Sequence, residues 1–137
     1  MIRFELNNKQ DCFYIRQLVF VEEQGFHNEF DDIDNTCIHI SMYENDQVIG
    51  CARIFEEERG LIIGRIAVLI EYRGRGLGSK ILEYIHEYAM ENKYLETHLH
   101  AQCRACKFYE SLGYKSYGEI EFDEHVEHIW MKKCLVY

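Results

Sequence analysis

The stretch that decides the fold is Ile66-Ala67-Val68-Leu69-Ile70-Glu71-Tyr72-Arg73-Gly74-Arg75-Gly76-Leu77-Gly78-Ser79-Lys80-Ile81-Leu82. An apolar, β-rich run ends at Ile70, three glycines follow on alternate positions, and apolar residues then take helical spacing. The segment predicts a strand, a glycine loop and a helix that begins near Ser79. Glycines leave no Cβ in the way, so successive N–H groups can converge at the positive end of the helix, which is typical of a phosphate-binding turn.

The glycine spacing excludes two common phosphate loops. A Walker A loop requires Gly-Lys-Ser/Thr, which Ser79-Lys80 does not supply, and a dinucleotide fingerprint requires a third glycine one residue later than here. What remains is Arg73-x-x-Gly76-x-Gly78 after a strand. This pattern resembles the coenzyme A pyrophosphate loop of the GCN5-related N-acetyltransferase superfamily. The alternative is a glycine turn that only joins the strand to the helix.

The composition indicates one domain over residues 1–137. The chain is 47% hydrophobic, and a chain of this length can stand on a single core. A net charge of -9 argues against duplex nucleic acid or an anionic membrane as a partner and is compatible with a cationic one. The sequence has no apolar run of membrane-spanning length and no signal-peptide core at its start. We therefore expect a cytoplasmic protein with reduced cysteines.

The periodicity predicts a mixed order of elements. Alternating apolar residues predict an initial strand, and Asn8 is placed to cap a helix that stops near Gly25. Three further strands precede the glycine loop, and the helix after the loop ends near Asn92. The expected strands are residues 2–6, 37–43, 47–55, 61–70 and 95–101, followed by a helix over 103–112 and a hairpin of 117–122 with 126–135.

Two further sequence segments support the resemblance. Ala105-Cys106-Lys107-Phe108-Tyr109-Glu110-Ser111-Leu112-Gly113-Tyr114 looks like the superfamily's A-x-x-F-Y-E-x-L-G-F signature. Arg16-Gln17-Leu18-Val19-Phe20-Val21-Glu22-Glu23-Gln24-Gly25, with Asp31-Asp32-Ile33-Asp34 and His39, is similar to the ElaA-like branch. The resemblance implies a three-layer α/β/α domain of mixed α/β class, with a central, mostly antiparallel twisted sheet and a splayed strand pair. Ile70 and Gln102 depart from the family's usual proline and asparagine.

The resemblance also implies an activity. An acyltransferase of this family moves an acetyl group from acetyl-CoA, its co-substrate, directly to a primary amine of a small molecule or peptide. Tyr109 matches the family's general acid, with a core tyrosine packed beside Phe108 as the alternative. The Val68 N–H is the candidate oxyanion donor. The implied cofactor-binding residues are Ile66, Ala67, Val68, Arg73, Gly74, Arg75, Gly76, Leu77, Gly78 and Ser79.

An acceptor amine must lose a proton before it attacks a thioester, so a base is expected. The candidates by residue type are Glu23, His39, His98, His100 and His128. Glu23 and His128 rank first, because each lies in a sequence segment that resembles the ElaA-like branch. The acidic runs from Glu22 to Asp34 and from Glu119 to Glu127 favour a cationic acceptor.

Alternatives from other classes remain open in the sequence. His98-x-His100-x-x-Cys103-x-x-Cys106 contains zinc-type ligands, but its cysteines fall on the helix that carries Tyr109, so we expect no metal. The glycine loop alone also fits an acyl-CoA-binding regulatory domain without catalysis, and the His/Cys run fits a zinc-stabilised interaction module. Monomer and homodimer are both compatible with the chain.

Overall fold

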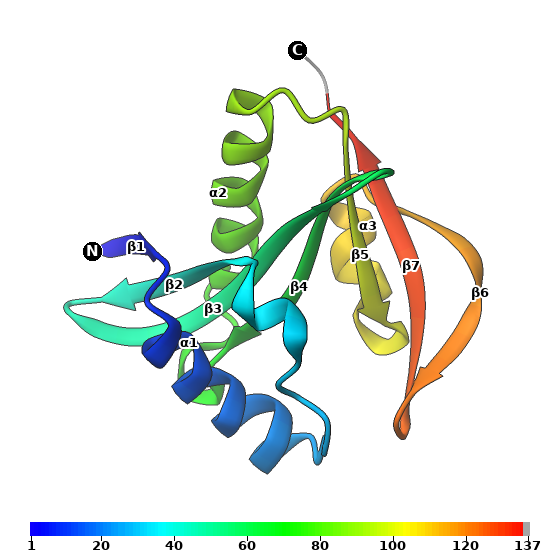
Figure 1. The fold of residues 1–137 in the computed structure, drawn as a ribbon. Helices are drawn as coiled ribbons and strands as arrows, with labels where there is room; N and C mark the ends of the chain where they lie inside the picture. Colours follow the sequence, from blue (N-terminus) through cyan, green and yellow to red (C-terminus); the bar gives the residue numbers. More distant parts are fainter. Residues whose placement is uncertain (136–137) are drawn as a thin grey trace.

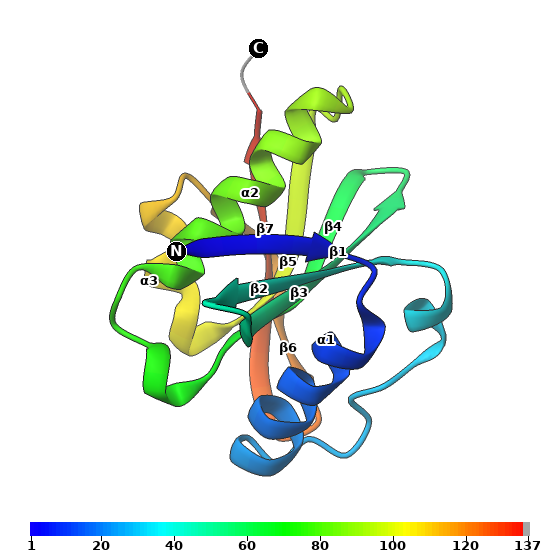
Figure 2. The same cartoon turned by 90° about the vertical axis from the view of Figure 1, so that its left-hand side faces the viewer.

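The computed structural model describes residues 1–135, in which seven strands form one sheet with helices on both faces (Figures 1 and 2). The strands are β1 (Ile2–Leu6), β2 (Ile38–Glu44), β3 (Gln47–Glu57), β4 (Gly60–Val68), β5 (Glu96–Gln102), β6 (Lys115–Asp123) and β7 (Val126–Cys134). Their order is β1-β2-β3-β4-β5-β7-β6, and only β4 and β5 pair in parallel. The predicted mixed α/β fold with a mostly antiparallel sheet is confirmed. The single-domain expectation extends to residues 136–137, which lie outside the described residues.

The larger core lies between the sheet and helix α2 (Leu77–Glu91). Its buried residues recur at helical spacing, so they form one stripe against the strands. These residues are Leu77, Ile81, Leu82, Ile85 and Ala89. The short helix α3 (Cys106–Ser111) contributes Tyr109 to the same face of the sheet. This packing fixes the start of α2, and with it the glycine loop.

The second core lies on the opposite face, under helix α1 (Lys9–Arg16). The Asn8 side chain caps α1 by accepting the Asp11 N–H at 3.1 Å, as the sequence predicted. The chain continues as a π-helical segment, η1 (Gln17–Glu23), and turns at Gly25, whose φ is +78°. The predicted end of the helix is correct. The π-helical second half was not predicted, because apolar spacing does not distinguish it from α-helix.

Two boundaries near the glycine loop differ from the prediction. Strand β4 ends at Val68 rather than Ile70, because the residues that follow form a 3₁₀ turn, η3 (Ile70–Tyr72). Helix α2 begins at Leu77 rather than Ser79. Gly76 has a φ of +74° and turns the chain directly into the helix.

Two later boundaries also differ. The predicted helix over residues 103–112 is divided into a 3₁₀ turn, η4 (Cys103–Ala105), and α3. Strand β6 begins at Lys115, two residues before the prediction, because Lys115 already pairs with Lys132 of β7. Within residues 1–135, no helix combines the length and the apolar character needed to cross a membrane.

Candidate active site

Strands β4 and β5 pair at one end only, and the sheet forks where they separate (Figure 1). Parallel pairing covers residues 61–63 of β4 and 97–99 of β5. Beyond these residues β4 continues to Val68 and β5 to Gln102 without pairing to each other. This fork is the splayed strand pair that the family resemblance implied.

A β-bulge in β4 accompanies the fork. Arg53 and Cys51 of β3 face Gly64 and Ala67 of β4, so β4 has one more residue than β3 in this interval. Arg65 lies within the bulge and has a φ of +53°, a left-handed conformation that is uncommon for a residue with a side chain. A bulge bends its strand and increases the local twist, and so it helps to turn the end of β4 away from β5.

Beyond the bulge, β4 offers backbone groups to the fork. Leu69 donates its N–H to β3 at 2.9 Å. Antiparallel pairing alternates residues that bond to the neighbouring strand with residues that point away from it. Ala67 is therefore in register to bond to β3, whereas the backbone groups of Ile66 and Val68 point into the fork. The Val68 carbonyl there accepts a hydrogen bond from Arg73 Nε at 2.8 Å. Of the three predicted β4 contacts, the register favours Ile66 and Val68.

The glycine loop has empty space at the Cβ positions of two of its glycines. Gly74 and Gly76 have φ values of +79° and +74°, and a Cβ on either would meet nothing within 4 Å. Among the described residues 1–135, no side chain caps the start of α2 at Leu77, and the first N–H groups of a helix have no partner within it. A Cβ on Gly78 would lie 3.3 Å from the Phe108 ring, so a side chain there would require this ring to shift by a few tenths of an ångström. The loop therefore presents unpaired donors beside the fork.

Both arginines of the loop are held by carboxylates. Arg73 forms a bidentate pair with Glu23 of η1, with both N–O distances at 2.7 Å. Arg75 Nη2 lies 2.5 Å from Glu44 Oε2 of β2. The hydrogen bonds from Arg73 lower the pKa of Glu23, which makes this carboxylate a weaker base. These pairs attach the loop to η1 and to strand β2.

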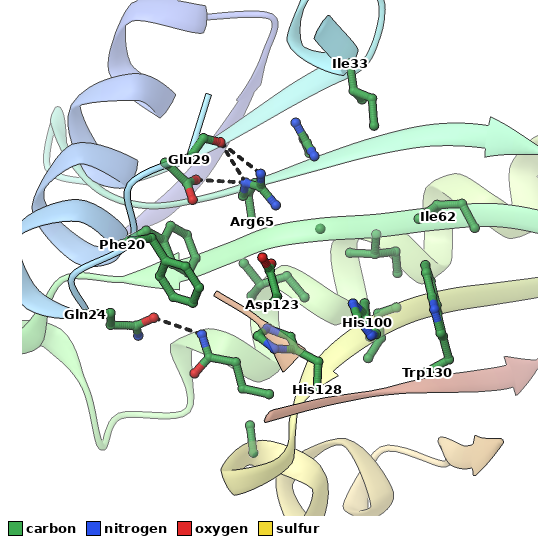
Figure 3. A pocket seen from close by; sticks show the side chains of 18 of the residues that line it. Phe20, Gln24, Glu29, Ile33, Ile62, Arg65, His100, Asp123, His128 and Trp130 are labelled. Atoms are coloured by element: carbon green, nitrogen blue, oxygen red, sulfur yellow. Dashed lines mark hydrogen bonds and ion pairs between the residues drawn. The ribbon is translucent and has the colours of Figure 1, made fainter. Parts of the chain in front are cut away.

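A cavity of about 510 Å³ opens at the fork on the side of α1 (Figure 3). Glu29 and Arg65 lie across it from His100 and His128 (Figure 3). Phe20, Phe26, Ile62 and Trp130 supply apolar walls. A second hollow, of about 670 Å³, shares Gln24 and Arg104 with the first and is lined by Glu23 and Arg73. The second hollow therefore adjoins the cavity and reaches Arg73, the first residue of the loop motif.

A buried ion network closes one side of the cavity. Its three arginines and three carboxylates are Arg16, Arg53, Arg65, Glu29, Asp31 and Asp34. Burial acts to raise the pKa of Asp34, but hydrogen bonds from Arg16 and other partners hold it well below its usual range. The carboxylates of this acidic stretch are thus neutralised internally. They give little support to the predicted attraction of a cationic acceptor.

Tyr109 is one of the residues that line the cavity. It reaches the cavity from α3, and its ring packs edge-on against Phe108 and Tyr114, at centroid distances of 5.1 and 6.0 Å. Burial, with a contribution from Cys106, raises the pKa of Tyr109 to about 12. The phenol is therefore protonated at neutral pH and is available as a proton donor, as well as packing in the core.

His128 also lines the cavity, and its hydrogen bond identifies its tautomer. The residue is 6% exposed, and Nδ1 lies 2.9 Å from the Val126 carbonyl oxygen. A carbonyl can only accept a hydrogen bond, so Nδ1 carries a proton and, in the neutral ring, Nε2 has a lone pair. His100 lies beside it and stacks on Trp130, at a centroid distance of 4.7 Å. His128 thus has the form of a base.

The other predicted histidines serve structural contacts. His39 is buried under α1, with Nε2 3.0 Å from the Asp34 carbonyl oxygen, and it does not line the cavity. His98 Nδ1 lies 2.7 Å from the Tyr117 hydroxyl, also outside the cavity. Gln102 donates to Gln24 at 2.8 Å, so its amide is already occupied.

The structure does not bring together the His/Cys run that was considered as an alternative zinc site. Within residues 1–135, no close group of three or more ligand-type side chains includes His98, His100, Cys103 or Cys106. The group that does occur is Asp34, Cys37 and His39. Because Arg16 and Arg53 already bind the Asp34 carboxylate, a cation at this group would meet two positive charges.

Sequence reasoning missed Trp130 and Asp123, which line the cavity. Trp130 follows His128 by two residues in β7, so strand alternation was a signal for it. Asp123 lies at the end of β6, and its position depends on the hairpin register, for which a single sequence offers no signal.

A sheet that forks between two parallel strands, with a glycine loop and helix start beside the fork, defines the acyl-CoA N-acyltransferase class of folds. The model of the acetyltransferase (GNAT) domain matches residues 13–135. YjcF of Bacillus subtilis, described as an uncharacterized N-acetyltransferase, is 32% identical, over 90% of this chain and 91% of YjcF. The chain therefore belongs to the GNAT acetyltransferase family, and it is an acyltransferase by that membership.

Solved structures agree with this assignment. A crystal structure assigned as an N-acetyltransferase from Lactobacillus plantarum has a TM-score of 0.91 at 26% identity, covering 98% of this chain and 99% of that one. Escherichia coli ElaA has a TM-score of 0.86 at 25% identity, covering 97% and 99%, which confirms the ElaA-like resemblance. A GNAT acetyltransferase from Elizabethkingia anophelis with acetyl-CoA bound shares the fold, with a TM-score of 0.75 at 15% identity, covering 98% of both chains.

Proposed function

We propose that this protein transfers an acetyl group from acetyl-CoA directly to a primary amine of a small molecule or peptide. One observation carries the proposal: the fork exposes backbone groups of β4 beside a glycine loop with unpaired helix-start donors. The bound acetyl-CoA of the Elizabethkingia anophelis relative supports the choice of acyl donor.

The residues present fit acetyl-CoA in chemistry and in order along the chain. N–H groups of the loop and the first turn of α2, from Gly74 to Ser79, bind the diphosphate, because the positive end of a helix favours anions. The backbone groups of Ile66 and Val68 pair with the amides of the pantetheine arm. Arg73 and Arg75 hold the loop in place through their carboxylate partners and add positive charge near the phosphates.

Three groups then divide the chemistry. His128 Nε2 accepts the proton of the acceptor amine, for which its tautomer is suited. The N–H of Val68 stabilises the oxyanion as the amine attacks the thioester carbonyl. Tyr109 donates a proton to the departing thiolate, which needs a donor that is still protonated at neutral pH.

We assign Glu23 to a positioning role. It was one of two leading candidates for the base, but its carboxylate is held by Arg73, and its pKa is lowered. The pair instead ties η1 to the glycine loop. His128 is therefore the base in this proposal.

We keep a cationic acceptor in the proposal, and this part now rests on Asp123 alone. Asp123 lines the cavity, and no ion pair or hydrogen bond engages its carboxylate among residues 1–135. It provides a site for a second positive charge on the acceptor, away from the reacting amine. We further take residues 1–137 as one cytoplasmic domain that acts as a monomer or homodimer.

Release of free thiol tests the proposal. Purified protein with acetyl-CoA is offered polyamines, amino acids, lysine-containing peptides and peptide amino termini, and the acetylated product is identified by mass spectrometry. The proposal expects thiol release that depends on an amine. Binding of acetyl-CoA without release for any amine would favour the acyl-CoA-binding regulatory domain instead.

A further inference from the structure

Two imidazoles and a carboxylate lie in sequence from the cavity toward solvent. The rings of His128 and His100 have centroids 5.0 Å apart with an interplanar angle of 36°. His100 Nε2 lies 3.1 Å from Glu121 Oε1 on β6. The Glu121 side chain is 58% exposed, whereas His128 is 6% exposed. The three side chains therefore join a buried position to the surface.

The strand register explains why they meet. His128 of β7 lies opposite Gln102 of β5 on one side and Glu121 of β6 on the other. His100 is two residues before Gln102, and alternate residues of a strand share a face. His100 and His128 thus face the cavity together, and Glu121 reaches them from the edge strand of the sheet.

His100 has an unfilled hydrogen-bonding capacity. Its Nε2 is one of two buried side-chain nitrogen or oxygen atoms in residues 1–135 that lack a hydrogen-bond partner, since the contact with Glu121 is close in distance but poorly aligned. Native structures leave few such atoms, and each calls for an explanation. Proton exchange of His100 with His128 and with Glu121 explains the free nitrogen.

We propose that His100 and Glu121 relay to solvent the proton that His128 takes from the acceptor amine. The proposal rests on the proposed function. The N–H bond of the amine breaks, and Nε2 of His128 gains the proton. His100 accepts this proton on its other ring nitrogen and releases a proton from Nε2 to Glu121, which gives it to water, so that both imidazoles are neutral again. Only one imidazole carries the proton at a time, because two positive charges this close repel each other.

The charges around His100 set the expected pH dependence. Glu121 and Asp123 face it from β6 and favour its protonated form, while His128 opposes this form from β7. Across the cavity lie Glu29 from the loop before β2, Glu57 and Arg53 from β3, and Arg65 from β4. Burial and His128 prevail and lower the pKa of His100, so this ring is neutral and able to accept a proton near pH 7.

Charge-matched variants of β6 test the relay. Glu121→Gln keeps the shape but removes the exit for the proton, and Glu119→Gln removes the same charge from the same strand at an exposed residue without a contact to His100. We expect Glu121→Gln to lower kcat about 10-fold, with the KM for acetyl-CoA unchanged. The acid limb of its kcat/KM profile should move to lower pH, because the lost negative charge no longer favours protonated imidazole. Glu119→Gln should match the unmodified protein.

A second variant separates proton transfer from packing. His100→Phe keeps an aromatic ring on Trp130 but cannot carry a proton. Added imidazole buffer should restore its kcat in proportion to concentration, and should leave the unmodified protein unchanged. A structural role for His100 predicts no such rescue.

Three results would overturn the relay. One is Glu121→Gln matching Glu119→Gln in kcat and pH profile, and another is His100→Phe showing no rescue by imidazole. If the unmodified protein acetylates no amine, the proposed function fails first. NMR titration of the ring nitrogens then decides the relay by itself. The relay predicts that the titrations of His100 and His128 are coupled and that both shift in Glu121→Gln. Independent titrations of the two rings would overturn the relay.

Discussion

Glu23 and Arg73 form a bidentate ion pair that joins η1 to the glycine loop, with both N–O distances at 2.7 Å. The same guanidinium donates from Nε to the Val68 carbonyl at 2.8 Å, so one side chain links the α1 layer, the loop and the end of β4. One arginine thus holds three parts of the fold together. This relationship has a kinetic consequence.

Glu23→Gln should weaken the hold on the loop without removing the base. We expect the KM for acetyl-CoA to rise several-fold and kcat to fall by less than about 3-fold, because an exposed pair of this kind contributes only about 0.2–1 kcal/mol. Steady-state kinetics at saturating acceptor provide the measurement, with Glu22→Gln as the control on the same segment. A loss of kcat of about 100-fold at unchanged KM would instead make Glu23 the base.

Tyr109→Phe should lower kcat by about 100-fold or more, because the leaving thiolate loses its proton donor. Affinity for acetyl-CoA should be unchanged, since the ring and its packing remain. The matched control is Tyr84→Phe, because Tyr84 stacks on Phe4 and lies outside the cavity. Equal activity of the two variants would show that Tyr109 packs in the core and is not the proton donor.

Asp34→Asn should destabilise the fold by about 3–5 kcal/mol, because it removes the carboxylate that Arg16 and Arg53 share and leaves the network's three arginines with only two carboxylates. The folded-state pKa of Asp34 lies below its ordinary value of about 3.9, so its contribution is complete above that pH and is lost as pH falls further. Urea unfolding at neutral pH measures the loss. The exposed Asp46→Asn should change stability by less than about 0.5 kcal/mol, and equal effects of the two would contradict the network's role.

His86 should make the protein sensitive to mild acid. Burial, and to a lesser extent Lys133, lowers its pKa to about 4, while the unfolded chain has an ordinary value of about 6.5. Between these values the unfolded state binds more protons, so stability falls as pH drops from about 6.5 toward 4. His86→Gln should show a shallower fall in melting temperature over this window. Parallel melting curves for the two proteins would contradict the assignment.

The sequence predicted the parts of the site that depend on local spacing. Strand, glycine loop and helix around Gly76 were readable because glycine positions and apolar periodicity act within a few residues of each other. The same is true of the Tyr109 helix. The bulge at Arg65 was not readable, since it follows from pairing with β3. The Arg73–Glu23 pair and the approach of Glu121 to His100 depend on contacts 50 and 21 residues apart along the chain, which local patterns do not reveal.

Calorimetric titration with acetyl-CoA shows whether the glycine loop binds the donor's diphosphate. The informative variant is Gly76→Asp, with Gly118→Asp as its control, because both glycines have φ near +75° and open space at Cβ, but Gly118 lies on β6. We predict saturable binding at one site for the unmodified protein and for Gly118→Asp, and at least about 10-fold weaker binding for Gly76→Asp, whose carboxylate repels phosphate. Absence of binding to the unmodified protein, or equal affinity in the two variants, would contradict the account.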